Sequence, residues 1–253
     1  MKNFKSVLIT GGAQRIGESI AKFLGKSGYN VAIQFNRSSK KALLLKEYFD
    51  ELDVRFKAFK FNLEKSKEID QFYNNLIRDF GKIDILINNA STFNFDTVTN
   101  SNQKIFDKHI NVNLKAPFFL SHNFVKYLGK QNGLIINLID QRVKNITPYF
   151  TSYTLSKSAL YTLTKSLSLF LAPKIRVNGI SPGPTLISKN QNQNQFKRQI
   201  LRTPLRKKVD LSEINSAVDY LIKNNSVTGE VLTIDSGQSL GWTHSKSKVY
   251  KSD

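Results

Sequence analysis

The 253-residue chain contains no cysteine. This absence excludes a disulfide framework and any zinc site with thiolate ligands. It is also typical of proteins kept in a reducing compartment, so a cytoplasmic location is expected. The three histidines, His109, His122 and His244, lack the spacing of metal ligands. We therefore predict no metal site and assign each histidine to the surface or to packing.

Long apolar runs are absent too. No segment approaches the ~18 consecutive apolar residues that a membrane-spanning helix needs, so no membrane span is expected. The apolar run of Val7, Leu8 and Ile9 near the N-terminus is too short for the core of a signal peptide. It is better explained as the middle of a β-strand.

Acidic residues are scarce: 19 Asp and Glu stand against 38 Lys and Arg, which gives a formal net charge of +19. Such a charge attracts anionic partners, among them a phosphorylated cofactor, an acidic substrate or nucleic acid. Because the lysines are spread along the chain without a compact basic run, we assign most of them to solvated surface and do not expect a nucleic-acid partner. The basic tail at residues 243–253 is expected to be a mobile end.

Short β-prone apolar runs alternate with longer segments of helical periodicity. This alternation predicts a parallel sheet with helices on both faces, in the strand order 3-2-1-4-5-6-7. We therefore predict one doubly wound α/β domain over residues 1–242. The expected strands are 6–10, 30–35, 54–59, 83–87, 133–139, 175–180 and 230–234, and the expected helices are 15–26, 40–52, 67–80, 103–128, 152–171 and 211–223.

The segment 188–202 departs from this alternation, because a run of Asn and Gln is followed by basic residues. It has two interpretations. One is a disordered surface insert. The other is a lid, since the segment follows the sixth strand at the edge of the sheet where ligands bind.

A glycine-rich loop, Thr10-Gly11-Gly12-Ala13-Gln14-Arg15-Ile16-Gly17, connects the first strand to the first helix. Such glycines permit a tight turn and the close approach of a pyrophosphate, while the helix N-terminus supplies free N–H groups. About 20 residues further on, NAD-binding folds carry an acid that binds the ribose 2′-hydroxyl. Here Asn36, Arg37 and Ser38 replace it, which predicts NADPH over NADH with Arg37 as the main phosphate ligand.

Tyr153 and Lys157 are four residues apart, so they share one face of a predicted helix that begins with Thr151 or Ser152 as its N-cap. Together with the glycine loop, this pair resembles the short-chain dehydrogenase/reductase family, and the resemblance extends over residues 7–240. The family loop reads Thr-Gly-x-x-x-Gly-x-Gly. Arg15 replaces its second glycine, as in the pteridine reductases and dihydromonapterin reductases, where an Arg lies near the cofactor phosphate and the pterin.

The resemblance implies a Rossmann-like NADP-binding domain and a homotetramer with the helices 103–128 and 152–171 at an interface. Asn62 replaces the Asp that accepts a hydrogen bond from adenine in the family, and an amide oxygen can also accept one. The cofactor-binding residues are then expected to be Gly11, Arg15, Ile16, Gly17, Asn36, Arg37, Ser38, Asn62, Leu63, Asn89, Ala90, Tyr153, Lys157, Pro182 and Gly183.

In this family Tyr153 would be the proton donor, and Lys157 would lower its pKa and bind the nicotinamide ribose. Asn113 resembles the active-site Asn of the family's proton relay. The position 13 residues before the Tyr is Asp140, where most members have Ser. An ionised Asp only accepts hydrogen bonds and opposes a developing alkoxide, so it disfavours simple ketone reduction. Pteridine reductases resemble this chain in having an Asp-Tyr-Lys set.

The predicted catalytic residues are therefore Asp140, Tyr153, Lys157 and Asn113, and the predicted substrate-binding residues are Arg15, Ser91, Phe93, Asp140 and Tyr153. Phe93 would stack on a pterin, although it could also be core filler. The expected function is NADPH-dependent reduction of a 7,8-dihydropterin, with dihydromonapterin, dihydrobiopterin and dihydrofolate as candidates. The alternatives are a 3-oxoacyl or other carbonyl reductase, an inactive relative in which Asp140 only caps the strand end, and a non-catalytic nucleotide-sensing or nucleic-acid-binding protein.

Overall fold

Seven parallel strands form one sheet in the order β3-β2-β1-β4-β5-β6-β7, as the sequence predicts. The computed structural model describes residues 5–189 and 191–241, so the predicted tail at 243–253 lies outside the described residues. The strands are β1 (Ser6–Thr10), β2 (Asn30–Phe35), β3 (Phe56–Lys60), β4 (Ile85–Asn88), β5 (Gly133–Leu138), β6 (Ile175–Pro182) and β7 (Val231–Ile234).

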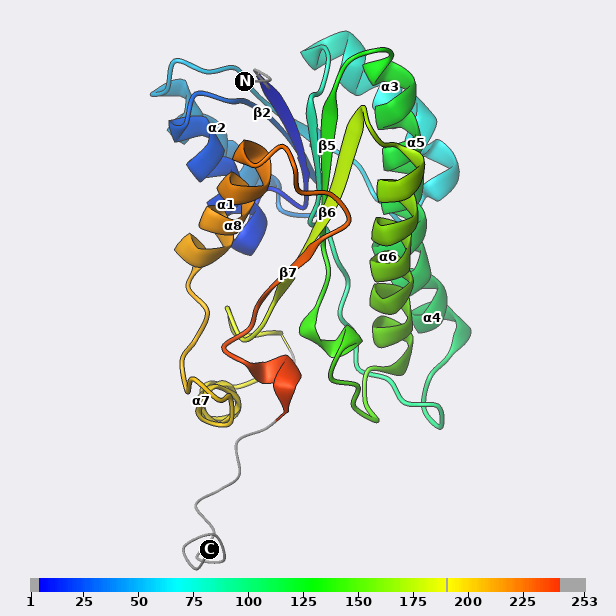
Figure 1. The fold of residues 1–253 in the computed structure, drawn as a ribbon, viewed down its shortest axis with the longest axis vertical. Helices are drawn as coiled ribbons and strands as arrows, with labels where there is room; N and C mark the ends of the chain where they lie inside the picture. The colour runs from blue at the N-terminus through cyan, green and yellow to red at the C-terminus, as the bar shows by residue number, and fades with distance from the viewer. Residues whose placement is uncertain (1–4, 190, 242–253) are drawn as a thin grey trace, which may run out of the picture.

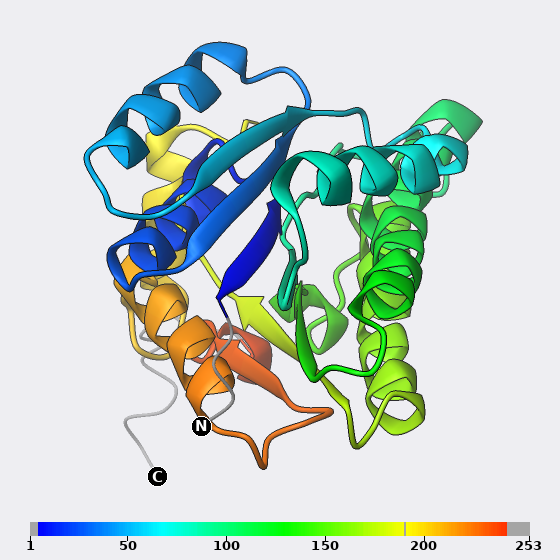
Figure 2. The ribbon, with the colours of Figure 1, turned by 90° about the horizontal axis from the view of Figure 1, so that it is seen from above.

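Helices cover both faces of the sheet (Figures 1 and 2). One face is covered by α1 (Arg15–Lys26), α2 (Ser39–Asp50) and α8 (Leu211–Lys223). The other is covered by α3 (Ile69–Phe80), α5 (Ala116–Leu128) and α6 (Thr151–Phe170). The central strands are fully buried, which explains why β4 and β5 read as continuous apolar runs rather than alternating ones. The structure therefore confirms the doubly wound α/β fold.

The expected helix at 103–128 is divided into three parts. It consists of α4 (Gln103–Ile110), a π-helical turn η2 (Asn111–Lys115) and α5. Pro117 lies in the first turn of α5 and has no N–H to donate to the carbonyl of Asn113. This missing donor accounts for the widened turn. The sequence prediction of one uninterrupted helix was therefore wrong, and the turn places Asn113 in the site described below.

The segment after β6 contains an ordered helix, α7 (Gln193–Leu201). A capping box starts it: the Asn192 side chain accepts from the Gln195 amide, and the Gln195 side chain accepts from the Asn192 amide. The alternative of a disordered insert was therefore wrong for residues 191–202. Throughout the described part of the chain, no helix combines the length and apolar character needed to span a membrane.

Candidate active site

The predicted site residues gather where the strands end. In a parallel sheet all carboxyl ends share one edge, the lower edge in Figure 1. The glycine loop follows β1, Asn89 follows β4, Asp140 follows β5, and Gly183 follows β6. The N-terminal end of α6, which carries Tyr153 and Lys157, also lies at this edge.

The conformation of the glycine loop is fixed by its backbone dihedral angles and by hydrogen bonds to residues that follow β4. Gly11 has a φ of +62°, which favours glycine, and a Cβ on Gly17 would lie 2.4 Å from the carbonyl oxygen of Gly11. Asn89 donates from Nδ2 to the carbonyls of Thr10 (2.8 Å) and Gly11 (3.3 Å). The Thr10 hydroxyl accepts from the amide of Ala90 at 2.9 Å. The loop can therefore admit a pyrophosphate against the first turn of α1.

Arg15 links this loop to the segment after β6. Its guanidinium donates to the carbonyls of Ile187 (2.8 Å) and Leu186 (3.2 Å), and its own φ is +58°. The alternative of an arginine that merely points to solvent was wrong. The predicted contact of Arg15 with cofactor phosphate and substrate stays a prediction, and the observed bonds place the guanidinium between the two chain segments that would surround them.

The predicted 2′-phosphate and adenine residues lie together at the ends of β2 and β3. Asn36 donates from Nδ2 to Oδ1 of Asn62 at 3.2 Å, and the same oxygen accepts from the Glu64 amide at 3.1 Å. Arg37 is exposed, and no carboxylate among the described residues lies within 4 Å of its guanidinium. Ser38 directly precedes α2, and Leu63 is buried beside Asn62. The exposed guanidinium of Arg37, which pairs with no carboxylate among the described residues, fits an anionic ligand.

At the end of β6, Gly183 packs closely against β7. A Cβ on Gly183 would lie 2.5 Å from the Cα of Asp235, and its amide donates to the carbonyl of Ile234 at 2.9 Å. The glycine is thus required by the close approach of two segments of the chain at the predicted nicotinamide side. Pro182, the last residue of β6, pairs in register with Ile234.

Three buried or half-buried groups form the centre of the site. The phenol of Tyr153 donates to Oδ2 of Asp140 at 2.7 Å. The other carboxylate oxygen of Asp140 accepts from the Arg142 amide at 2.8 Å, so Asp140 both caps the turn after β5 and contacts the phenol. Lys157 is buried and donates from Nζ to the carbonyl of Leu138 at 2.7 Å.

Burial determines the protonation of this centre. Burial raises the pKa of Tyr153 well above its ordinary value, and the charge and hydrogen bond of Asp140 raise it further, while Arg142 and the Ser91 hydroxyl act in the opposite direction. Burial lowers the pKa of Lys157 to about 8, against the opposing effect of Asp140. The sequence led us to expect Lys157 to lower the pKa of Tyr153. The structure differs, because the adjacent carboxylate and burial keep the phenol protonated.

Asn113 fastens the loop after β4 to α6. Its Nδ2 donates to the Ser156 hydroxyl (3.0 Å) and the Thr92 carbonyl (3.1 Å). Its Oδ1 accepts from the Thr92 amide (2.9 Å) and the Ser91 hydroxyl (3.2 Å). Asn113 is fully buried, and its side chain is fully used in these bonds. Its predicted part in a proton relay would have to involve its backbone.

Phe93 lies beside Tyr153 rather than in the core. Its ring stacks on Phe150 at 4.2 Å between centroids and meets the ring of Tyr153 edge-on at 4.6 Å. The side chain is only half-buried and belongs to neither large core cluster. The alternative of core filler was therefore wrong. Sequence reasoning missed Phe150, although it lies only three residues before Tyr153.

His109 and Asp96 support the start of α6. His109 is buried: Nε2 accepts from the Asn94 amide at 3.0 Å, and Nδ1 lies 2.6 Å from the Ser152 hydroxyl. The expectation of Ser152 or Thr151 as N-cap was wrong, since the helix starts after Phe150, whose φ is +60°. The free Ser152 amide donates to the Asp96 carboxylate at 3.1 Å instead. The prediction of a packing role for His109 is confirmed, but its place beside Tyr153 was missed.

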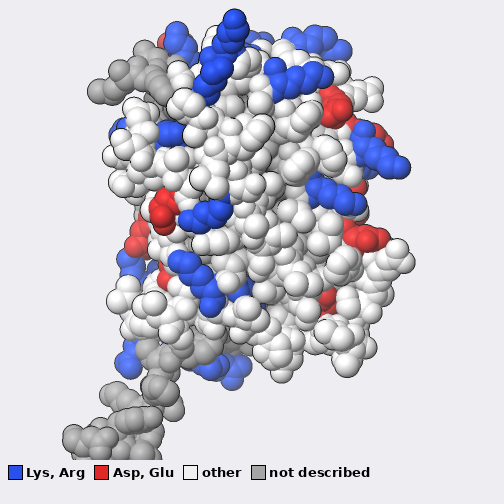
Figure 3. Space-filling view, turned by 45° about the vertical axis from the view of Figure 1, so that its right-hand side comes forward, with Lys and Arg blue, Asp and Glu red and all other residues white. Residues whose placement is uncertain are grey.

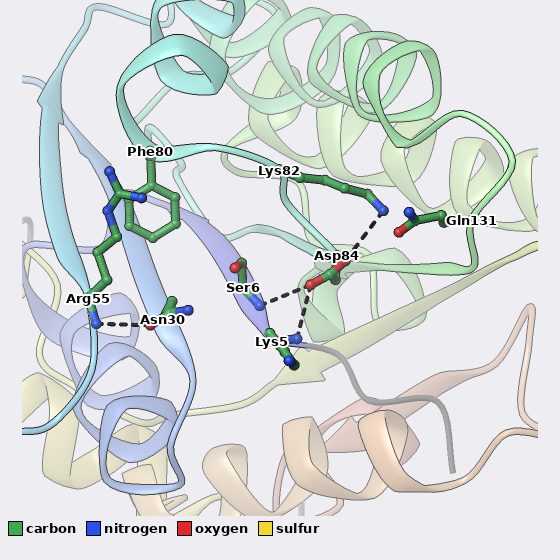
Figure 4. Close-up of a pocket in the computed structure, with 8 residues that line it drawn as sticks. All are labelled: Lys5, Ser6, Asn30, Arg55, Phe80, Lys82, Asp84 and Gln131. Carbon is green, nitrogen blue, oxygen red and sulfur yellow. Dashed lines mark hydrogen bonds and ion pairs between the residues drawn. The ribbon is translucent and has the colours of Figure 1, made fainter.

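A cavity of about 360 Å³ lies at the opposite, amino-terminal edge of the sheet (Figure 4). Its lining includes Ser6, Arg55, Lys82 and Asp84, and none of the predicted site residues. The cavity is therefore separate from the candidate site. On the face seen in Figure 3, the basic side chains are scattered among neutral and acidic ones, as expected for solvated lysines. Within residues 5–189 and 191–241, no cluster of three or more His, Asp or Glu side chains is arranged to hold a metal.

A phosphate-binding glycine loop and a buried Tyr–Lys pair at the carboxyl edge of a doubly wound sheet define an NAD(P)-dependent oxidoreductase. The chain belongs to the short chain dehydrogenase family, whose sequence pattern matches residues 5–198.

Two kinds of relative stand out. The chain is 39% identical to FolM alternative dihydrofolate reductase 1 from Brucella suis, solved in complex with NADP, with a TM-score of 0.92 over 96% of this chain and 98% of that one. The Brucella canis protein of the same name, also complexed with NADP, is 38% identical, with a TM-score of 0.91 over 96% of each chain. The chain is also 29% identical to the 3-oxoacyl-[acyl-carrier-protein] reductase FabG of Buchnera aphidicola, over 94% of this chain and 98% of that protein.

Proposed function

We propose that this protein reduces a 7,8-dihydropterin to its tetrahydro form with NADPH. The observation that carries the proposal is the carboxylate of Asp140, 2.7 Å from the Tyr153 phenol, at the position where a carbonyl reductase of this family would offer a hydroxyl. A carboxylate accepts hydrogen bonds from the N–H groups of a pterin but repels a developing alkoxide. The likeness to the two Brucella dihydrofolate reductases supports the same conclusion.

The chemistry divides between the cofactor and the chain. When bound, NADPH supplies a hydride to ring carbon C6. Tyr153, kept protonated by burial and by Asp140, is placed to donate the accompanying proton to N5, directly or as a relay. Asp140 anchors the pterin through its ring nitrogens. Lys157 is cationic at neutral pH, because its pKa lies at about 8, and it holds the nicotinamide ribose and restores the Tyr153 proton.

NADPH rather than NADH is supported by the end of β2. Arg37 is exposed there and has no carboxylate partner in the described part of the chain. None of positions 36–38 carries an acidic residue. A 2′-phosphate gains charge-assisted hydrogen bonds from a guanidinium, whereas the acid of an NAD site would repel it. The glycine loop with Gly11, Ile16 and Gly17 would hold the pyrophosphate.

A carbonyl reductase is the second candidate, and the likeness to the FabG protein favours it. The two candidate functions predict different effects of Asp140 on the rates of pterin reduction and carbonyl reduction. The test is NADPH oxidation with dihydromonapterin, dihydrobiopterin, dihydrofolate and a 3-oxoacyl thioester, each with wild type, Tyr153→Phe and Asp140→Ser. Pterin-dependent oxidation that both substitutions abolish supports the pterin reductase. Thioester turnover by the wild type without pterin turnover overturns it and establishes the carbonyl reductase.

We also propose a homo-oligomer, with a tetramer as the expected state. Its interface would be the outer surface of α5 and α6, where large apolar side chains are exposed. These are Phe118 and Phe119 on α5, and Leu155, Leu169 and Phe170 on α6, the last two 83% exposed. An apolar surface of this kind is typical of a face that another subunit covers.

A further inference from the structure

Arg142 has a side chain that the proposed reaction does not use. Its guanidinium carbon lies 4.9 Å from the centre of the Phe150 ring and 5.7 Å from that of Phe93, the stacked pair beside Tyr153. Nη1 donates to the Thr147 hydroxyl at 2.7 Å. The backbone amide of the same residue binds the carboxylate of Asp140. The Thr147 bond and the two rings thus fix the position of the guanidinium, two residues after Asp140 in the sequence.

This cation has no anionic partner. Among the described residues, no carboxylate lies within 4 Å of the Arg142 guanidinium, Asp140 included, and Thr147 is the only acceptor of its N–H groups. The side chain is half-buried against two aromatic rings. A partly desolvated guanidinium without a counter-ion is costly to maintain, and its planar fork matches a carboxylate. A guanidinium in these surroundings is suited to bind an anionic group of the substrate.

We propose that Arg142 selects the substrate by charge: it receives a carboxylate on the side chain of the pterin, while Asp140 and Tyr153 hold the ring. This proposal rests on the proposed function, whose substrate class it narrows to pterins with an acidic substituent, of which dihydrofolate is one. The positive net charge of the chain would add long-range attraction for such a substrate. The nearby Lys144 does not compete for this role, because its Nζ donates to the Thr233 hydroxyl at 2.9 Å.

The test compares two substrates in the intact protein, dihydrofolate with its carboxylates and 6-hydroxymethyl-7,8-dihydropterin, which is neutral at that position. The quantity measured is the ratio of kcat/KM for dihydrofolate to kcat/KM for the neutral pterin. Arg142→Gln should lower this ratio by about tenfold or more, chiefly through the KM for dihydrofolate. Arg142→Lys should give an intermediate ratio, because it keeps the charge and loses the fork. Lys144→Gln, on the same loop, is the matched control and should leave the ratio unchanged.

Salt provides a second readout that a merely structural role would not move. The wild-type ratio should fall as ionic strength rises, and the ratio of Arg142→Gln should be nearly flat. An equal loss of kcat/KM for both substrates in Arg142→Gln would overturn the proposal, since it would mean that Arg142 only supports the stacked pair of Phe93 and Phe150. An unchanged ratio would overturn it as well. Failure of the proposed function looks different, because the wild type would then turn over neither pterin.

Discussion

The phenol of Tyr153 and the carboxylate of Asp140 share a hydrogen bond of 2.7 Å, so the protonation of the two groups is coupled. Asp140→Asn keeps the shape and removes the charge that raises the pKa of Tyr153. We expect the Tyr153 pKa to fall in this variant, and the rate of dihydropterin reduction to fall by about a hundredfold, the usual scale for a misplaced acid–base group. Phenolate absorbance during an alkaline titration reports the first effect and NADPH oxidation the second.

The control for that titration is the double variant with Tyr153→Phe, which removes the phenolate signal of interest and leaves the other tyrosines. A Tyr153 pKa that stays the same or rises in Asp140→Asn would contradict the assignment of Asp140 as the charged neighbour.

We expect Lys157 to set an upper pH limit on activity. Burial lowers its pKa from 10.5 to about 8, so the ammonium is present at pH 7 and is lost as the pH rises through about 8. In the proposed mechanism this cation holds the nicotinamide ribose and resupplies the proton, so kcat/KM for NADPH should decline above about pH 8. The measurement is the pH profile of kcat/KM under saturating pterin. A profile that stays level up to pH 10 would show that Lys157 keeps its proton, or that the reaction does not require the Lys157 ammonium.

We expect Arg37 to determine the preference between the two nicotinamide cofactors. Arg37→Gln should raise the KM for NADPH by about tenfold or more, the equivalent of one charge-assisted hydrogen bond, and leave the KM for NADH nearly unchanged. Lys40→Gln, an exposed cation on the following helix α2, is the matched control. A similar loss in both variants would mean that the general positive field, rather than a specific contact, attracts the 2′-phosphate.

The order of strands and the gathering of the site could be predicted because both follow from local patterns. Apolar runs of strand length and helical periodicity determine a doubly wound sheet, and the carboxyl ends of its strands place Asp140, Tyr153 and Gly11 at one edge. Gly17 was predictable for the same reason, since the turn at a strand–helix junction admits no Cβ there.

What sequence reasoning missed depends on contacts between distant residues. The π-helical turn at Asn113 arises from one missing donor at Pro117, together with side-chain bonds to loop residues far along the chain. The predicted N-cap of α6 was wrong because the acceptor for the Ser152 amide is the carboxylate of Asp96, more than 50 residues away in the sequence. The predicted direction of the Tyr153 pKa shift was wrong because burial and the Asp140 carboxylate raise the pKa by more than Arg142 lowers it. The spacing of residues in the sequence does not show which of these effects is larger.

The apolar surface of α5 and α6 predicts the state of the protein in solution. Sedimentation equilibrium should give the mass of a tetramer for the wild type, against 28.8 kDa for one chain. Phe170→Glu places a charge on a side chain that is 83% exposed in the single chain, so it should dissociate the assembly without unfolding the subunit. Leu205→Glu, at a 71% exposed apolar residue outside α5 and α6, is the control. A wild type that sediments as a monomer would contradict the proposed interface.

His109 connects stability to the geometry of the site. Its ring accepts from the Asn94 amide, contacts the Ser152 hydroxyl and packs edge-on against Tyr153. His109→Ala removes the ring that binds the Asn94 amide and the buried Ser152 hydroxyl, which should lower the free energy of unfolding by about 1–3 kcal/mol. Because the Tyr153 ring loses a neighbour, kcat should fall as well. Urea unfolding measures the first effect, and His122→Ala, at an exposed histidine, is the control.

The same residue gives stability a pH dependence of known sign. Burial lowers the pKa of His109, Lys108 lowers it further, and Asp96 opposes the shift. The unfolded chain therefore binds this proton at a higher pH than the folded chain, so the stability from a neutral His109 is present above the ordinary pKa of 6.5 and decreases as the pH falls below it. His109→Gln keeps a polar side chain that cannot titrate, and it should flatten the fall in stability below pH 6.5. An unchanged profile in this variant would show that other groups, and not His109, control stability in this range.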